Sequence, residues 1–242
     1  MLSIIIPLRN EYENLYQIER QFSENFKQVK HEVILVNDYS DDNTLLKAQE
    51  ISNKNNNFIT LNNSNKGLGG AINLGIAKAR GDYICIMMAD FSDDLNDLKK
   101  YYDLIHNKKL DAVFGSRFIK GSKVLNYPKK KYILNRVFNF IVSIIFFNKF
   151  NDFTNAFKIY RSNVLKSFLP LVSESFNVFL EMPLKVISRG YSFDVISINW
   201  TGRKIGEAKF NIKELRSKYL FTLIYCFIEK ILLSKKKDVF KE

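Results

Sequence analysis

The chain has 242 residues and a hydrophobic content of 46%, which is ordinary for one globular domain with at most a small appendage. Its formal net charge of +12 indicates an anionic partner, such as a phosphate ligand, a nucleic acid or an acidic membrane surface. The two cysteines lack the spacing of a disulfide framework or a metal site, so they favour a reducing, cytoplasmic setting.

Strands and helices alternate along the first half of the chain. Apolar runs predict strands at residues 2–6, 32–36, 58–61, 83–88 and 111–115. Helical spacing predicts helices at residues 11–26, about 44–53, 67–79 and 95–107. This alternation is typical of an α/β fold with a mostly parallel, doubly wound sheet.

Longer apolar segments follow after about residue 120. We expect helices at 132–147, 176–189 and 212–233, and strands at 156–160 and 191–200. The first and last of these helices are too short or too interrupted to cross a membrane, which takes roughly 20 apolar residues. The last helix carries Leu220, Leu223, Ile224, Phe227, Ile228 and Ile231 on one broad face. We therefore divide the chain into a domain at 1–211 and a C-terminal amphipathic helix with a basic tail at 212–242.

Acidic side chains follow three of the predicted strands. Glu11 comes after the first strand, Asp38 after the second and Asp90 after the fourth. Ligands of open α/β sheets bind beyond the carboxyl ends of the strands, where these side chains would meet. A carboxylate there can hold a divalent cation, and the cation can hold a diphosphate. The pattern favours a nucleotide site.

Helix capping is the alternative role for two of these acids. Ser40 and Asp41 are better placed than Asp38 to cap the second helix, which leaves Asp38 for a base or ribose. Asp93 and Asp94 are better placed than Asp90 to cap the helix near residue 95. We therefore interpret Asp90 as a metal ligand.

Glu11 and the glycines after residue 66 each keep two interpretations. Glu11 could line the nucleotide pocket or only favour the dipole of its helix. The segment Gly67-Leu68-Gly69-Gly70-Ala71 could open a helix whose N–H groups approach an anion, or form a plain turn.

Six segments in order give the chain its resemblance to a known family. It resembles family 2 glycosyltransferases with a GT-A fold, and among them polyprenyl-phosphate sugar transferases of the dolichyl-phosphate mannose synthase type. The matching segments are Pro7 to Glu11, Asn37 to Thr44, Gly67 to Ala71, Gly115-Ser116-Arg117, Asp152 to Arg161, and Arg203 with Gly206 and Lys209.

The resemblance implies a nucleotide-sugar donor, a polyprenyl-phosphate acceptor, Mg²⁺ or Mn²⁺, and inversion in a single displacement. It assigns nucleotide binding to Pro7, Arg9, Glu11, Asp38, Gly67 and Lys209. It assigns catalysis to Asp90, Arg117, Asp152 and Arg203, with Asp90 holding the metal and Arg117 and Arg136 holding the acceptor phosphate. For each arginine the alternative is a surface cation.

The chain departs from the family pattern at two positions. Met88 stands where the family has the first acid of its Asp-x-Asp motif, and Asn37 replaces the first acid of the second-strand pair. Metal binding would therefore depend on Asp90 with help from diphosphate oxygens and water. The missing acid favours one alternative, a binding or scaffold protein that kept the fold and lost turnover.

A soluble or glycan hydroxyl is the alternative acceptor. A hydroxyl needs a base to take its proton, and Asp152 is the candidate. The helices 132–147 and 212–233, beside Lys129–Lys131 and Lys235–Lys237, favour peripheral binding to an anionic membrane, at its inner, cytoplasmic face. Core packing or a homo-oligomer through these apolar helices is the alternative. Nucleic acid is not expected as a partner, because the basic runs are not interleaved with stacking aromatics.

Overall fold

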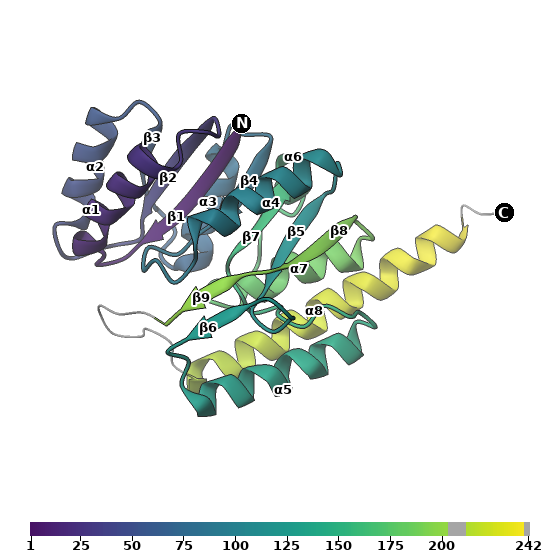
Figure 1. Ribbon diagram of the computed structural model, residues 1–242. Coiled ribbons are helices and arrows are strands. Elements are labelled where there is room, and N and C mark those ends of the chain that lie inside the picture. The colour runs from purple at the N-terminus through teal and green to yellow at the C-terminus, as the bar shows by residue number, and fades with distance from the viewer. Residues whose placement is uncertain (203–211, 240–242) are drawn as a thin grey trace.

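A seven-stranded sheet with helices on both faces forms the centre of the molecule (Figure 1). The computed structural model describes residues 1–202 and 212–239. The strands of this sheet are β1 (Leu2–Leu8), β2 (His31–Asn37), β3 (Phe58–Asn62), β4 (Tyr83–Ile86), β5 (Ala112–Ser116), β7 (Lys158–Arg161) and β8 (Phe193–Ser197). A separate ribbon pairs β6 (Lys123–Leu125) with β9 (Asn199–Thr201).

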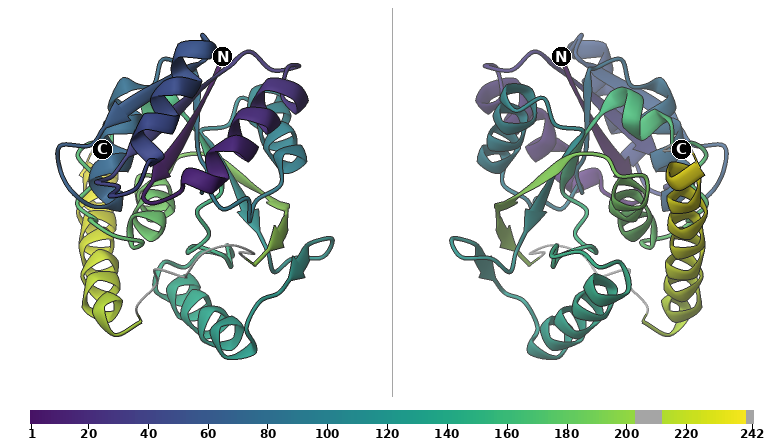
Figure 2. Two further views of the ribbon diagram at one scale, coloured as in Figure 1. Left: turned by 90° about the vertical axis from the view of Figure 1, so that its left-hand side faces the viewer. Right: turned by 90° about the vertical axis from the view of Figure 1, so that its right-hand side faces the viewer.

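Helices cover the sheet in two layers, each packed on its own hydrophobic cluster. One layer contains α1 (Tyr12–Arg20), a π-helical turn η1 (Gln21–Asn25), α2 (Thr44–Lys54) and α4 (Leu95–Asn107). The other contains α3 (Leu68–Lys78), α6 (Ser162–Lys166) and α7 (Val178–Ser188). Two longer helices, α5 (Lys129–Ile145) and α8 (Ile212–Val239), extend this second layer at one end of the molecule (Figure 2).

The sheet has the strand order β3-β2-β1-β4-β7-β5-β8 and is parallel except for β7. Side chains of β1 alternate between the two clusters, with Ile4 and Ile6 on one side and Ile5 on the other. Burial on both faces explains why these strands read as unbroken apolar runs. The predicted α/β fold with a mostly parallel sheet is confirmed.

The strand predicted at 191–200 is wrong, because the chain changes sheets within it. β8 pairs with β5, whereas β9 pairs with β6. The break falls at Ile198, which is buried, and the next N–H, of Asn199, donates to Asp97 Oδ2 at 2.7 Å. Alternating hydrophobicity continues through such a break, so the sequence pattern does not reveal it.

α8 packs on the body of the molecule with only part of its broad apolar face. Leu223 and Cys226 enter the core cluster and Thr222 is fully buried, while Leu220 and Ile224 remain 58% and 52% exposed. The buried side chains of α8 face α7 and the segment before it, which provides the hydrogen-bond partners of the Thr222 hydroxyl. The predicted boundary between residues 211 and 212 stays a prediction.

The buried hydroxyl of Thr222 connects α8 to the body of the molecule. It accepts a hydrogen bond from Asn177 Nδ2 at 2.9 Å and lies 3.2 Å from Ser173 Oγ. Asn177 and Ser173 are both 3% exposed, so a lost partner cannot be replaced easily by water. This contact is a polar anchor within an apolar interface.

We expect Thr222→Val to lower the free energy of unfolding by about 1–3 kcal/mol, because it leaves the Asn177 amide unpaired in a buried site. Urea denaturation followed by circular dichroism measures the change. Ser217→Ala removes an exposed hydroxyl from the same helix and should stay within about 0.5 kcal/mol of the parent. Equal stability of the two variants would contradict the anchoring role.

Candidate functional site

The carboxyl ends of β1, β2 and β4 bring the predicted nucleotide-binding residues to one edge of the sheet. Asp38, directly after β2, is 4% exposed. Its Oδ1 accepts hydrogen bonds from Gly67 N at 2.8 Å and from Asn63 Nδ2 at 2.9 Å. Gly67 has φ +122°, a conformation that favours glycine, and α3 begins at the next residue. Asp38 therefore holds the glycine turn at the start of α3.

Hydrogen bonds also join the loops after β1 and β2. Asn10 N donates to Ser40 Oγ at 3.1 Å, so Ser40 connects the loops rather than capping α2. Glu11 is 9% exposed, and its backbone N–H donates to Thr44 Oγ1 at 2.9 Å. Pro7 is buried within β1, whereas Arg9 is exposed at the mouth of this edge.

Asp90 lies half-exposed in the loop after β4, and its Oδ1 accepts from Ser92 N at 3.1 Å. Phe91, between them, has φ +53°, which is rare for a bulky residue and marks a tightly constrained loop. Asp94 caps α4, accepting from Asn96 N at 2.9 Å, as predicted. Asp93 does not cap it: the side chain is 6% exposed, and Oδ1 lacks a hydrogen-bond partner within the described residues.

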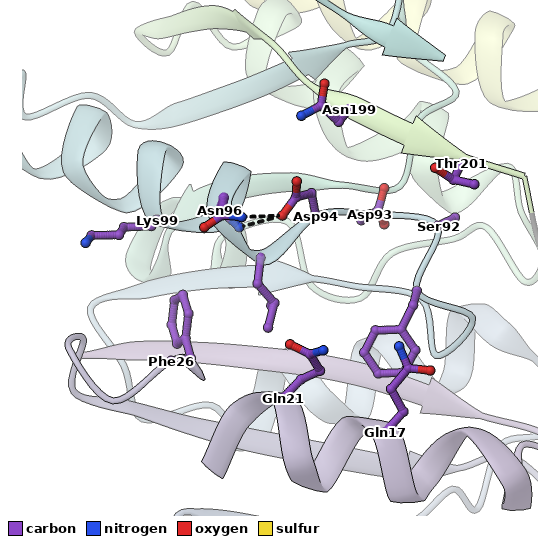
Figure 3. A pocket seen from close by; sticks show the side chains of 12 residues that line it. Gln17, Gln21, Phe26, Ser92, Asp93, Asp94, Asn96, Lys99, Asn199 and Thr201 are labelled. Atoms are coloured by element: carbon purple, nitrogen blue, oxygen red, sulfur yellow. Dashed lines mark hydrogen bonds between the residues drawn. The ribbon is translucent and has the colours of Figure 1, made fainter. Parts of the chain in front are cut away.

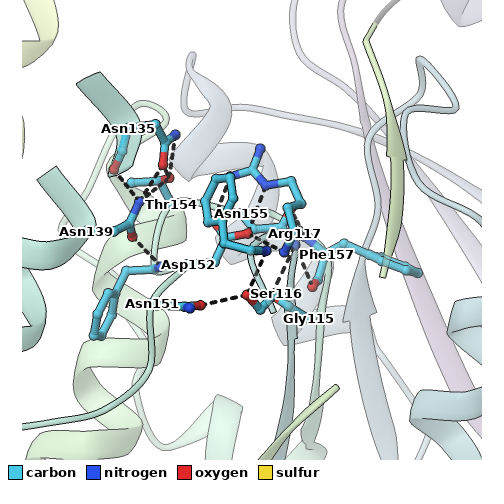
Figure 4. A network of polar contacts seen from close by, with 12 residues as sticks. Gly115, Ser116, Arg117, Asn135, Asn139, Asn151, Asp152, Thr154, Asn155 and Phe157 are labelled. Atoms are coloured by element: carbon cyan, nitrogen blue, oxygen red, sulfur yellow. Dashed lines mark hydrogen bonds and ion pairs between the residues drawn. The ribbon is translucent and has the colours of Figure 1, made fainter. Parts of the chain in front are cut away.

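A buried ion pair joins the end of β5 to the segment before β7 (Figure 4). Arg117 Nε donates to Asp152 Oδ2 at 2.8 Å, and a terminal nitrogen donates to Oδ1 at 2.7 Å. The backbone N–H of Arg117 donates to the same Oδ2 at 2.9 Å. Asp152 is fully buried and Arg117 is 8% exposed. Both oxygens of the predicted base are thus occupied by arginine.

Aromatic rings surround the Arg117 guanidinium. Its carbon lies 5.3 Å from the ring centre of Phe118 and 5.6 Å from those of Tyr127 and Trp200. Arg136, from α5, lies over the same Phe118 ring, with its guanidinium carbon 4.7 Å from the ring centre. The two predicted phosphate-binding arginines therefore share one aromatic neighbour.

Burial shifts the pKa of two further charged groups at this site. Burial and then the Asp90 carboxylate raise the pKa of Asp93 to about 7. Burial lowers the pKa of Lys158 to about 7, although Asp152 and Asp93 act in the opposite direction. The Lys158 amine donates to the carbonyls of Phe153 and Asn155. Sequence reasoning missed this lysine, whose only signal was a cation inside an apolar strand.

The same charges act differently on Arg117. Burial alone would lower its pKa, but the carboxylate of Asp152 outweighs this effect and raises it. Arg117 therefore stays protonated and supplies a fixed positive charge near Asp93, which also interacts with the Asp90 carboxylate.

The donor set around Asp90 fits a cation that arrives with a diphosphate. Among residues 1–202 and the described part of α8, no cluster of three or more His, Cys, Asp or Glu side chains forms a metal cage. Mg²⁺ is commonly held by one or two carboxylates together with substrate phosphates and water. A single half-exposed carboxylate at the nucleotide edge meets that requirement.

A polar cavity of about 590 Å³ lies behind the Asp90 loop (Figure 3). Gln17 and Gln21 approach it from one side, and Asn199 and Thr201 of β9 from the other. Of the predicted site residues that the structure describes, none lines this cavity. Two others, Arg203 and Lys209, lie outside the described residues.

Comparison with known proteins gives a family match and two informative relatives. The sequence model described as "Glycosyl transferase family 2" matches residues 3–169. A dolichol-phosphate mannosyltransferase of Pyrococcus furiosus is 33% identical over 135 residues, which are 56% of this chain and 38% of that protein. The chain thus spans well under half of that relative's length. A polyprenol monophosphomannose synthase of Mycolicibacterium smegmatis is 27% identical over 220 residues, covering 88% of this chain and 82% of that protein.

Solved structures show the same fold at lower identity. Glucosyl-3-phosphoglycerate synthase from Mycobacterium tuberculosis, in complex with Mn²⁺, UDP-glucose and phosphoglyceric acid, has a TM-score of 0.69 and 13% identity, covering 94% of this chain and 79% of that chain. Its complex with Mg²⁺ and UDP has a TM-score of 0.70 and 14% identity, with coverages of 93% and 79%. The GT-A fold expected from the sequence is confirmed.

The raised pKa of Asp93 predicts a pH-dependent stability. Its carboxyl is protonated more readily in the folded than in the unfolded chain, so it destabilises the fold as pH rises from about 4 to about 7. We expect Asp93→Asn to stabilise the protein relative to the parent by an amount that grows by roughly 2–3 kcal/mol between about pH 5 and pH 8.

Urea denaturation across that pH range measures this difference. Asp103→Asn, at an exposed position of α4, serves as the control and should give a difference that does not change with pH. A pH-independent difference for Asp93→Asn as well would show that Asp93 titrates normally.

Proposed function

We propose that this chain, which belongs to glycosyl transferase family 2, transfers a sugar from a nucleotide-sugar donor to a polyprenyl phosphate at a membrane surface. The two curated relatives support this acceptor, because both are named for sugar transfer to lipid phosphates. The observation that carries the proposal is the buried Arg117–Asp152 ion pair after the end of β5. It offers a fixed cation to an anionic acceptor and occupies the carboxylate that a hydroxyl acceptor would need as its base.

The donor would lie across the ends of β1, β2 and β4. Asp38 would accept a hydrogen bond from the base or ribose, beside the glycine turn that it already holds. Pro7, Arg9 and Glu11 would line the same pocket, as the family resemblance implies. Arg203 and Lys209 remain proposed ligands of the diphosphate.

The transfer itself requires no proton movement on the acceptor. A phosphate oxygen attacks the anomeric carbon on the face opposite the diphosphate, and the bond to the diphosphate breaks with its electron pair. A divalent cation held by Asp90 and the diphosphate would stabilise the charge on that leaving group. Arg117 and Arg136 would hold the attacking phosphate. Arg136 would offer its guanidinium fork to the oxygens, and Arg117, whose Nε and one terminal nitrogen already bond to Asp152, would offer its fixed positive charge.

The exposed apolar side chains of α5 and α8 support a membrane location for the acceptor. Across residues 1–202 and 212–239 there is no helix with the length and apolar character needed to cross a membrane. The two helices lie side by side, joined by edge-to-face contacts of Phe138 with Tyr219 and of Phe146 with Phe227. Their outward side chains include large apolar groups that are 41–87% exposed, namely Ile133, Leu134, Val137, Phe140, Ile141, Ile144, Phe147, Leu220, Phe221, Ile224, Ile228, Ile231 and Leu232.

A bilayer is the proposed occupant of this apolar surface. Lys129 and Lys130, exposed at the start of α5, complement anionic headgroups at the edge of the same surface. We therefore propose a peripheral position at the inner face of the membrane, with the apolar side chains reaching the acyl boundary. A homo-oligomer through the same helices is the competing occupant.

Replacing Asp90 with alanine tests the enzyme proposal. We expect Asp90→Ala to reduce transfer by more than about a hundredfold, because the leaving diphosphate loses its cation. Transfer of labelled sugar to a polyprenyl phosphate measures this, with Asp103→Ala as an exposed acid control. Full activity of Asp90→Ala, or undiminished parent activity in a chelator, would exclude the metal role.

Vesicle flotation tests the membrane proposal. Each lysine near an anionic surface contributes about 1 kcal/mol, so binding should weaken as salt rises and when Lys129–Lys131 become glutamine. The matched control changes three exposed lysines at the opposite edge of the sheet, Lys27, Lys30 and Lys54, and should float like the parent. A parent that stays unbound at low salt would favour the soluble acceptor instead.

A further inference from the structure

Helix α5 carries two different faces. Its outward face includes Val137 and Phe140, which are 51% and 65% exposed. Its inward face includes Asn139, which is fully buried. A buried amide is costly unless both its oxygen and its nitrogen find partners, so the contacts of Asn139 show what this position does.

Asn139 holds the backbone next to Asp152 (Figure 4). Its Oδ1 accepts from the N–H of Phe153 at 2.6 Å, and its Nδ2 donates to the carbonyl of Asn135 at 2.8 Å. Phe153 directly follows Asp152, whose carboxylate grips Arg117. Asn139 is thus hydrogen-bonded to the residue that directly follows the acid of the ion pair.

Asn135, one turn earlier on α5, strengthens the same connection. Its Nδ2 donates to Thr154 Oγ1 at 3.1 Å and to the Tyr127 hydroxyl at 3.1 Å. Thr154 lies in the segment after Asp152, and Tyr127 is one of the rings beside Arg117. The inward face of α5 therefore contacts both the segment that carries Asp152 and one of the aromatic rings beside Arg117.

The opposite side of this segment is fastened to β5. Ser116 Oγ donates to Asn151 Oδ1 at 2.6 Å, and Arg117 N donates to Asp152 Oδ2. The segment from Asn151 to Thr154 is consequently held between a strand of the central sheet and α5. Removing the α5 contacts would leave Asp152 fastened on one side only.

We propose that Asn139 is a positioning residue for the acceptor-phosphate site: it fixes the Phe153 backbone, and through it the orientation of Asp152 and of the Arg117 guanidinium. The proposal rests on the proposed function in that Arg117 is taken to face the acceptor phosphate. Because Asn139 stands on α5, the helix that meets the bilayer with its outward face also sets the phosphate site with its inward face.

Kinetics of Asn139→Leu test the proposal. Asn139→Leu leaves the Phe153 N–H without its partner and frees the backbone beside Asp152, so we expect KM for the polyprenyl phosphate to rise about tenfold. Donor affinity, measured by calorimetry, should not change. Asn139→Gln keeps both an accepting oxygen and a donating nitrogen and should recover part of the loss. Ser143→Ala, on the same helix, removes a hydroxyl that donates to the Phe140 carbonyl and is the control.

Nuclear magnetic resonance of the arginine side chain gives a readout that does not depend on activity. In the parent, the Nε–H of Arg117 is fixed on Asp152 and should give a slowly exchanging signal, assigned by its loss in Arg117→Lys. We expect this signal to broaden or disappear in Asn139→Leu and to persist in Asn139→Gln and Ser143→Ala. Asn139→Ala, which leaves room for a water molecule, replaces the leucine variant if that variant does not fold.

Two outcomes would overturn the proposal. One is an Arg117 Nε–H signal in Asn139→Leu that is as sharp as in the parent. The other is a rise in the donor's dissociation constant that equals the rise in acceptor KM, as a general loosening of the fold would produce. A parent without any transfer to lipid phosphate would refute the proposed function instead, and the resonance would still decide the positioning role.

Discussion

Burying a guanidinium away from water is costly unless a counter-ion contacts it, and this requirement determines the arrangement of the site around Arg117. Asp152 meets it with both oxygens, in a pair whose members are 8% and 0% exposed. Removing one partner of such a pair typically costs about 3–5 kcal/mol, because the other charge stays buried and alone. The end of β5 and the segment before β7 therefore cannot move independently. The Lys158 amine donates to the carbonyls of Phe153 and Asn155, which restrains the same segment further.

The chemistry of the acceptor follows from the same pair. A hydroxyl acceptor would need a carboxylate that is open to the substrate, whereas Asp152 spends its oxygens on Arg117. A phosphate acceptor is already ionised and needs only positive charge and orientation. In the proposed mechanism Arg117 would supply the positive charge, and its contacts with Asp152 would fix its orientation. The loss of the family's first acid at Met88 is consistent with a site in which fixed arginines carry part of the electrostatic work.

The sequence alone predicts those features of the site that depend on the order of strands and acidic residues along the chain. Asp38 and Asp90 were placed correctly at the sheet edge, because parallel strands end together. It was not sufficient where distant segments decide burial. Asp93 and Asp94 are adjacent and equivalent as capping acids, yet only Asp94 caps. Asp93 is buried because it bridges Trp200, a residue of β9 more than a hundred positions later.

The side of α8 that packs against the body of the molecule could not be chosen from the sequence, for a related reason. This helix carries more apolar side chains than the fold can bury, so hydrophobicity alone does not select the face that packs. The choice falls to Thr222, Leu223 and Cys226, because α7 and the segment before it offer a partner to the Thr222 hydroxyl.

The apolar side chains that α8 leaves exposed add to those that α5 exposes beside it. The fold does not use this surface to stabilise itself, so an external partner is its best explanation. The polar side of α5 narrows the choice of partner. Asn135 and Asn139 connect that side to the residues around Arg117, which places the proposed phosphate site directly behind the apolar surface. A lipid phosphate has this arrangement, with an apolar chain on one side and a charged group on the other.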